Sequence, residues 1–339
     1  MSQDNSEFDD IIPLLRILKE KYKGIGQDFG DYLQGLIEAD GLQYWDYIHV
    51  DALLGLQMPR TPYTDEVIFI TYHQICELYF KLIKLEITQL TDPKNEEYKN
   101  AEKWVKRISR VVNYFKHLCN SFDIMKNGMD RHDFKAFRMA LLPASGFQAA
   151  QFRHIEIMST NINSLLIPDS KDKRDIPLER LYEDIYWKRG GIDVKTGAKV
   201  LTLVEFEKKY DNEFLTMIKE YKFRNIAYLF YNSAPEIKEN EQIKDLLRSY
   251  DRYINVFWKM SHLMASSRHL PNTEGGSGGD TGTGGTNWRV YLPPKFQKLF
   301  FYETLWTEEE KRDWGKSAIM AAFRERVEAN WSTIKEIKQ

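Results

Sequence analysis

The sequence predicts an all-α fold, and two observations carry that prediction. Apolar residues recur at the 3.6-residue period of a helix along most of the chain. Almost no segment shows the period-two alternation of a half-buried strand, and the chain has no internal repeat. Of the 339 residues, 42% are hydrophobic and 29% are charged, which suffices for a sizeable core. We therefore expect an all-α chain, with room for one large domain or two medium ones.

The first half of the chain contains three long helical patterns, over residues 11–22, 65–90 and 96–125. Thr64 or Asp65 is expected to cap the second of these helices, because both residue types accept hydrogen bonds at a helix N-terminus. A proline-broken loop at residues 57–63 separates this helix from an aromatic stretch at residues 44–47.

Helical patterns return in the second half, over residues 130–142, 178–187, 200–217, 236–269 and 307–338. Residues 143–158 are expected to form a loop that runs into a helix, and residues 189–199 a turn or short hairpin. The glycine-rich segment 271–287 cannot be regular structure, and it is either a linker or a binding loop.

The composition argues against several classes of function. The formal net charge is −2, so the chain lacks the basic surface that attracts nucleic acid or an anionic membrane. No run approaches the roughly 20 apolar residues of a membrane span. Cys76 and Cys119 have neither zinc spacing nor a disulfide pattern, and the acidic start MSQDNSEFDD is not a secretory signal. We expect a cytoplasmic protein with no nucleic-acid or membrane partner.

Two stretches before residue 150 carry residues suited to ligand binding. Phe69 and His73 lie one turn apart on the long helix, so His73 is either a satisfied core residue or the polar point of a pocket. The 14% aromatic content likewise suits a thick helical core or a pocket for a flat ligand. Arg138 precedes a Pro-Ala-Ser-Gly turn that opens a helix, which is either a carboxylate receptor or an ordinary surface arginine beside a loop.

Two later stretches add further candidates. Trp258 and His262 lie four residues apart on one helical face. His262 has no second metal-ligating residue at zinc spacing, but a single histidine on a long helix is compatible with an axial haem ligand. Thr283 lies in the glycine-rich segment, which is not a phosphate-binding loop. This segment is either a lid that brings the Thr283 hydroxyl to a ligand or a flexible insertion.

Four blocks of this sequence resemble the tryptophan 2,3-dioxygenase family, in the family's order. They are YWDYIHVDALLGLQMP, DEVIFITYHQICELYFKLIKLEI, FRMALLPASGFQAAQFRHIE, and FWKMSH followed by GTGGTNWRVYL. Together they span about residues 44–292. The resemblance implies a helical bundle of the tryptophan/indoleamine 2,3-dioxygenase type, as a single all-α domain over residues 1–339, with one ferrous haem b per chain. It also implies insertion of O2 across the indole C2–C3 bond of L-tryptophan, to give N-formylkynurenine in the kynurenine route.

The resemblance assigns a role to each candidate residue. His262 is implied as the axial ligand of the haem iron, with Trp258, Ser145 and Gly146 around the haem. His73 is implied as the catalytic group that accepts the indole N–H. The other implied substrate-binding residues are Phe69, Phe134, Arg138 and Thr283, with Tyr44 and Tyr47 supplied by a neighbouring subunit.

The resemblance also implies a homotetramer, a dimer of dimers, in which residues 1–43 pack on a neighbouring subunit. Residues 271–287 would then be an active-site loop.

The sequence departs from the family pattern near the implied site. Phe134 stands where the family usually has tyrosine, and the family's W-R-x-R-H is here Trp258-Lys259-Met260-Ser261-His262. Residues 286–288 after GTGG also differ. These departures leave open a substituted tryptophan or another indole as substrate, insertion of one oxygen atom, a non-catalytic haem or indole sensor, and a helical scaffold without haem.

Overall fold

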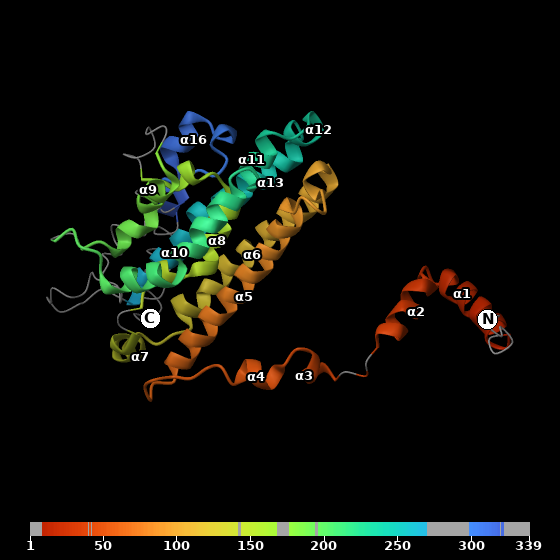
Figure 1. Ribbon diagram of the computed structural model, residues 1–339. Helices are drawn as coiled ribbons and strands as arrows, with labels where there is room; N and C mark the ends of the chain where they lie inside the picture. Colours follow the sequence, from red (N-terminus) through yellow and green to blue (C-terminus); the bar gives the residue numbers. More distant parts are fainter. Residues whose placement is uncertain are drawn as a thin grey trace, which may run out of the picture. The chain divides into compact units, whose positions relative to one another are not determined.

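Two compact units make up the chain, and each is described by itself. The computed structural model describes residues 9–39, 41, 43–141, 144–167, 176–193, 196–269, 298–318 and 320–321 (Figure 1). The first unit is Met1–Met58 and the second is Pro59–Gln339. The glycine-rich segment at residues 271–287, with Thr283, lies outside the described residues.

The helices of the first unit bury none of their own residues. They are α1 (Ile11–Gly24), α2 (Phe29–Glu38), α3 (Tyr44–Tyr47) and α4 (Val50–Leu54). Asp28 caps α2 by accepting hydrogen bonds from the backbone N–H groups of Gly30 and Asp31. Leu36 and Ile37 on α2 are 71% and 78% exposed, and exposed apolar side chains of this kind mark an interaction surface when they cluster.

Two long helices, α5 (Asp65–Thr91) and α6 (Ala101–Asn127), run side by side through the second unit (Figure 1). The segment before α6 forms a short 3-10 turn, Glu97–Lys99, and Asn100 then accepts a hydrogen bond from the Lys103 N–H. This cap explains why α6 begins at Ala101 and not at residue 96 as predicted. The fully buried residues on the facing sides of the pair include Ile83, Ile87 and Leu90 of α5 and Trp104, Ile108, Val111, Phe115 and Leu118 of α6.

Three further helices position the site against this pair. They are α7 (Arg131–Phe137), α8 (Ala150–Ser159) and α14 (Trp258–His269). α7 contacts α5 and α14, α8 contacts α5, and α14 contacts α6. Figure 1 shows α7 at the end of the pair where α5 begins.

The predicted helical stretch over residues 236–269 is divided in the structure. It contains α12 (Pro235–Lys238), α13 (Glu241–Arg252), a π-helical turn at Tyr253–Phe257, and α14. A π turn holds more residues per turn than an α-helix, so it changes the direction in which the residues of α14 face relative to α13. Such turns are frequent at functional sites.

The remaining elements cover the pair and the loops. They are the 3-10 turns Arg138–Leu141, Gly146–Gln148, Ile162–Leu165, Tyr186–Gly191 and Glu303–Leu305, with α9 (Leu178–Glu183), α10 (Leu201–Tyr221), α11 (Ile226–Tyr231) and α16 (Glu308–Asp313). The predicted turn at residues 189–199 contains an isolated antiparallel bridge between Ile192 and Lys199. The predicted C-terminal helix is interrupted after Asp313, where Gly315 has φ +81°.

The all-α prediction is confirmed. The part of the chain that the structure describes contains helices and two isolated bridges but no strand. None of its helices combines the length and the apolar character needed to cross a membrane.

Candidate active site

His73 of α5 and His262 of α14 face a common space. Both side chains are accessible to solvent. Burial by surrounding protein nevertheless lowers the pKa of His73, and it lowers the pKa of His262 to about 4. A side chain that is accessible and yet poorly solvated lines a concave surface. Repulsion from His73 contributes to the low pKa of His262, which places the two imidazoles within electrostatic reach of each other.

A hydrogen bond fixes the tautomer of His73. Its Nδ1–H donates to the backbone carbonyl of Phe69, one turn earlier on α5, over 2.7 Å. A carbonyl oxygen can only accept, so the proton of the neutral ring resides on Nδ1 and Nε2 carries the lone pair. His73 therefore offers one hydrogen-bond acceptor to a donor in the common space.

Aromatic rings form an apolar wall beside His73. The Phe69 ring centroid lies 4.1 Å from that of His73, 5.7 Å from Phe137 and 6.3 Å from Phe134. Phe134 and Phe137 are buried on α7, and His269 of α14 lies behind Phe134 at 5.1 Å between centroids. Tilted and edge-on contacts of this kind stabilise a rigid apolar surface, which suits a flat aromatic ligand.

Arg138 extends this wall with a positive charge. It follows Phe137 directly, and its half-buried side chain loses enough solvation to lower its pKa, although a guanidinium stays charged at neutral pH. Asp130 holds the start of α7 in place. It caps that helix through the N–H groups of His132 and Asp133, and its own N–H donates to Asp65 of α5 over 2.6 Å.

A turn at Ser145–Gln148 borders His262. A Cβ atom added at Gly146 would lie 4.0 Å from Nε2 of His262, so glycine keeps side-chain atoms away from that nitrogen. The turn is held by a hydrogen bond from the Ser145 N–H to Gln148 Oε1 over 3.0 Å. A second bond runs from Gln148 Nε2 to the Thr202 carbonyl over 3.2 Å.

The residues around His262 fit a haem group. At neutral pH its imidazole is unprotonated and accessible, as a metal ligand must be. Gly146 leaves the space beside Nε2 clear of side-chain atoms. A lone imidazole in such a place suits an iron that brings its other ligands with it.

Trp258 supports the site from within the core. Its ring packs against Phe122 at 4.9 Å, Phe80 at 5.8 Å and Phe152 at 6.4 Å between centroids. Phe122 in turn meets the His262 ring edge-on at 6.0 Å. Trp258 thus contacts His262 indirectly, and its predicted role around the haem stays a prediction.

Comparison with known proteins gives a consistent result. A family model for tryptophan 2,3-dioxygenase matches residues 31–184, which include His73, Arg138 and Gly146. The tryptophan 2,3-dioxygenase of Bordetella parapertussis is 25% identical over 279 residues, which cover 78% of this chain and 89% of the relative. That of Bradyrhizobium diazoefficiens is 27% identical over 276 residues, 78% of this chain and 91% of the relative. That of Sorangium cellulosum is 38% identical over 135 residues, 38% of this chain and 32% of the relative.

The chain is similar to tryptophan 2,3-dioxygenases. This similarity indicates an oxidoreductase of the dioxygenase type. It agrees with the all-α fold and with the grouping of Phe69, His73, Phe134 and His262.

Three predicted site residues are not placed at this site. Tyr44 and Tyr47 belong to the first unit, where each is 73% exposed on α3. Thr283 lies outside the described residues. Their roles in a tryptophan 2,3-dioxygenase site stay predictions.

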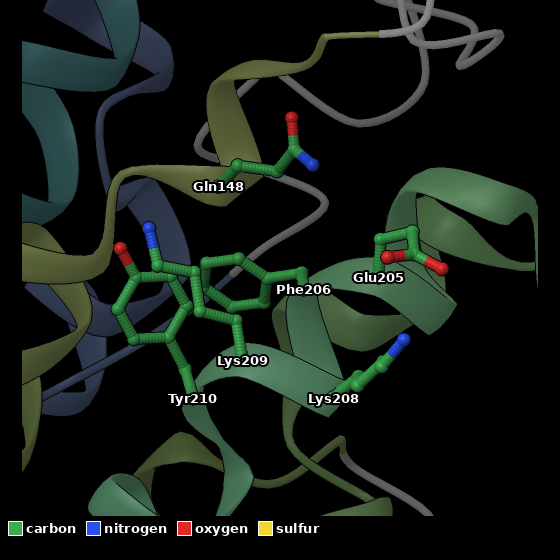
Figure 2. Close-up of a pocket in the computed structure, with 6 residues that line it drawn as sticks. All are labelled: Gln148, Glu205, Phe206, Lys208, Lys209 and Tyr210. Carbon is green, nitrogen blue, oxygen red and sulfur yellow. The ribbon is translucent and has the colours of Figure 1, made fainter.

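A surface pocket of about 530 Å³ is lined by neither histidine. Its lining residues are Gln148, Glu205, Phe206, Lys208, Lys209 and Tyr210. Figure 2 shows Phe206 in the middle, Gln148 above it, and charged side chains to either side. The pocket shares only Gln148 with the turn beside His262. The side-chain amide of this residue is already hydrogen-bonded to Ser145 and Thr202.

The sequence did not single out Phe137 or Phe122, which complete the aromatic surroundings of the two histidines. The three-residue spacing of Phe134 and Phe137 on one helical face was the available signal for Phe137. Burial raises the pKa of Cys76 and of Cys119 to about 12, so neither thiol is a nucleophile at neutral pH.

Proposed function

We propose that this protein is a haem-dependent dioxygenase that inserts O2 across the indole C2–C3 bond of L-tryptophan and yields N-formylkynurenine. The observation that carries the proposal is the pair of neutral imidazoles at one space, of which His73 presents Nε2 as an acceptor. Similarity to tryptophan 2,3-dioxygenases supports the reaction class.

On the cofactor side, His262 would hold the iron of one haem b through Nε2, with Gly146, Ser145 and Trp258 around the group. When bound, haem supplies the chemistry that activates O2. The side chains near His262 orient the cofactor and exclude water. The low pKa of His262 keeps its imidazole unprotonated across the neutral range, so protons do not compete for the nitrogen.

On the substrate side, an indole needs a flat apolar wall and one hydrogen-bond acceptor. Phe69 and Phe134 would supply the wall, and His73 Nε2 would accept the indole N–H. Arg138 would pair with the substrate carboxylate, since a guanidinium fork binds a carboxylate through two parallel hydrogen bonds. We infer that Thr283 meets the amino-acid head group.

We also infer a homotetramer in which Tyr44 and Tyr47 reach a neighbouring subunit's site. The exposed aromatic side chains of α3 and the unburied helices of the first unit favour a partner surface for this segment. The cytoplasmic location stays a prediction.

A second candidate substrate is a substituted tryptophan or another indole, and the reaction could then insert one oxygen atom. Phe134 favours this alternative, because the ring lies in the wall without the hydroxyl that the family usually has there. A non-catalytic haem or indole sensor would bind the same ligands without turnover.

The test mixes the reduced, haem-loaded full chain with L-tryptophan in air and measures N-formylkynurenine. His262→Ala, treated in the same way, is the control for haem-independent oxidation. Labelled O2 and mass spectrometry count the oxygen atoms in the product. Two labelled atoms support the proposal, one favours the substituted-indole reaction, and none with haem bound and substrate saturating overturns it. A protein without a Soret band after haem supplementation would be a helical scaffold.

A further inference from the structure

Lys259 is a buried cation that the proposed reaction does not use. It lies on α14, and the residue is only 8% exposed. Its Nζ finds no hydrogen-bond acceptor among the residues that the structure describes. A buried ammonium without an acceptor is destabilising, so its presence calls for a physical reason.

The acids nearest to Lys259 are already engaged. Glu156 is paired with Arg153 at 2.7 Å and also accepts the Tyr186 hydroxyl at 2.5 Å. Asp251 accepts hydrogen bonds from the Trp306 indole at 2.8 Å, from Asn255 Nδ2, and from the backbone N–H groups of Phe301 and Tyr302.

The Lys259 ammonium instead lies 4.9 Å from the centroid of the Tyr186 ring. Glu156 is already paired with Arg153, so the Lys259 ammonium hydrogen-bonds to neither acid, although the negative charges of Glu156 and Asp251 attract it.

The Lys259 charge lies close to His262. Lys259 precedes His262 by three residues, and residues three apart on a helix are neighbours on its surface. Arg153 donates from Nε to the carbonyl of Phe147 over 3.3 Å, in the turn that places Gly146 beside His262. A charge in a poorly solvated interior changes the electrostatic potential at a residue one helical turn away, because neither water nor salt screens it fully.

We propose that Lys259 sets the electrostatic potential at His262 so that a haem iron bound there favours its ferrous state. The inference rests on the proposed haem site. Reduction adds an electron to the iron and lowers its positive charge, so a nearby fixed cation stabilises the reduced form relative to the oxidised form. Lys259 acts through this field and touches neither substrate nor iron, so it is not a catalytic residue.

The main experiment measures the midpoint reduction potential of haem-loaded full-length protein. Lys259→Met should shift the potential to more negative values, while Lys259→Arg keeps the charge and should stay near the wild type. Lys116→Met removes a charge from an exposed position on α6 and is the matched control, with a much smaller shift expected. Equal potentials in the wild type and Lys259→Met, with the same Soret spectrum, would overturn the inference and leave the proposed function intact.

The pH dependence of the potential gives a second readout. Burial lowers the pKa of Lys259 to about 8, against the opposing attraction of Glu156 and Asp251 and with added repulsion from Arg153. Tyr186 stays a neutral phenol, since burial raises its pKa. The wild-type potential should fall as pH rises through about 8, and Lys259→Met should lack this step. A step of the same size in both proteins contradicts the assignment to Lys259.

The apoprotein provides a test that needs no cofactor. If the buried charge has no partner, Lys259→Met and Lys259→Gln should both unfold at a higher urea concentration than the wild type. A lower unfolding midpoint in both variants would mean that Lys259 has an acid partner, and this would overturn the inference. Failure of the wild type to bind haem would overturn the proposed function and the inference together.

Discussion

Helices α5 and α14 each present a histidine to the same space, but different surroundings stand behind the two residues. Behind His73 lies an apolar wall of phenylalanine rings, and the Nδ1–H of His73 donates a hydrogen bond to the backbone carbonyl of Phe69. Behind His262 lie Phe122 and, one turn away, the buried charges around Lys259. In the proposed function, the same residue type would thus be a neutral hydrogen-bond acceptor for a flat molecule on one side and a metal ligand close to the Lys259 charge on the other.

The variant His262→Ala is expected to have the largest effect on the difference between the two histidines. This change should abolish haem retention, because the iron loses the one imidazole proposed to hold it. His73→Ala should keep the haem. The Soret absorbance after haem supplementation and gel filtration measures both. Reversed phenotypes would mean that the acceptor and the ligand have been assigned to the wrong helices.

Arg138→Ala tests the charged end of the wall on the α5 side. It should weaken binding of a carboxylate-bearing indole by about 2–5 kcal/mol, the usual cost of removing one partner of a desolvated charge pair. Arg138→Lys should recover only part of this loss, since an ammonium cannot form the two parallel hydrogen bonds of a guanidinium. Substrate dissociation constants from spectral titration measure the effect. Indole itself, which has no carboxylate, should bind all three proteins equally.

A third histidine, His154, shows how burial lowers the pKa of an imidazole outside the candidate active site. It lies on α8 between Lys84, 2.9 Å from its Nδ1, and Glu213, 3.1 Å from its Nε2. Burial and the Lys84 charge lower its pKa from 6.5 to about 4. The unfolded chain therefore binds more protons between these values, and stability is lost as pH falls from about 6.5 toward 4. In His154→Gln, the loss of unfolding free energy over this pH range should be smaller by about 3 kcal/mol. Urea unfolding of the apoprotein at each pH measures it.

His73→Gln and His73→Ala test whether His73 accepts a hydrogen bond from the indole N–H. The alanine variant should lose about 1 kcal/mol of stabilisation for an indole with a free N–H, which is the net worth of one neutral hydrogen bond. The glutamine variant retains an acceptor oxygen and should lose less. Values of kcat/KM for L-tryptophan and 1-methyltryptophan measure the difference. Equal losses on both substrates would contradict a bond from the indole N–H to His73.

Phe134→Tyr should have the smallest effect. Restoring a hydroxyl to the wall should change kcat/KM for L-tryptophan by no more than about 1 kcal/mol, with a gain if the hydroxyl finds a partner on the substrate. Comparing L-tryptophan with ring-hydroxylated tryptophans measures the change in preference. A loss for L-tryptophan accompanied by a gain for a hydroxylated ring would favour the substituted-indole alternative.

The structure confirms the long helices that the sequence predicted from local pattern, whereas Thr64 does not form the side-chain cap that was expected for α5. The helical periods of α5 and α10 and the spacing of Phe69 and His73 follow from residues close together in the chain. Element ends were less predictable. The cap at Asn100, the π turn before α14 and the interruption at Gly315 depend on single side chains and on packing that a periodic pattern does not record.

By itself, the sequence determined the all-α class and the family resemblance, because both rest on contiguous motifs and helical periodicity. Only the tertiary structure decided that His73 and His262 share one space, that His73 keeps its proton on Nδ1, and that Lys259 is buried without an acid of its own. The physical reason is that solvation, tautomer and charge balance depend on neighbours distant in the chain, which packing alone brings together.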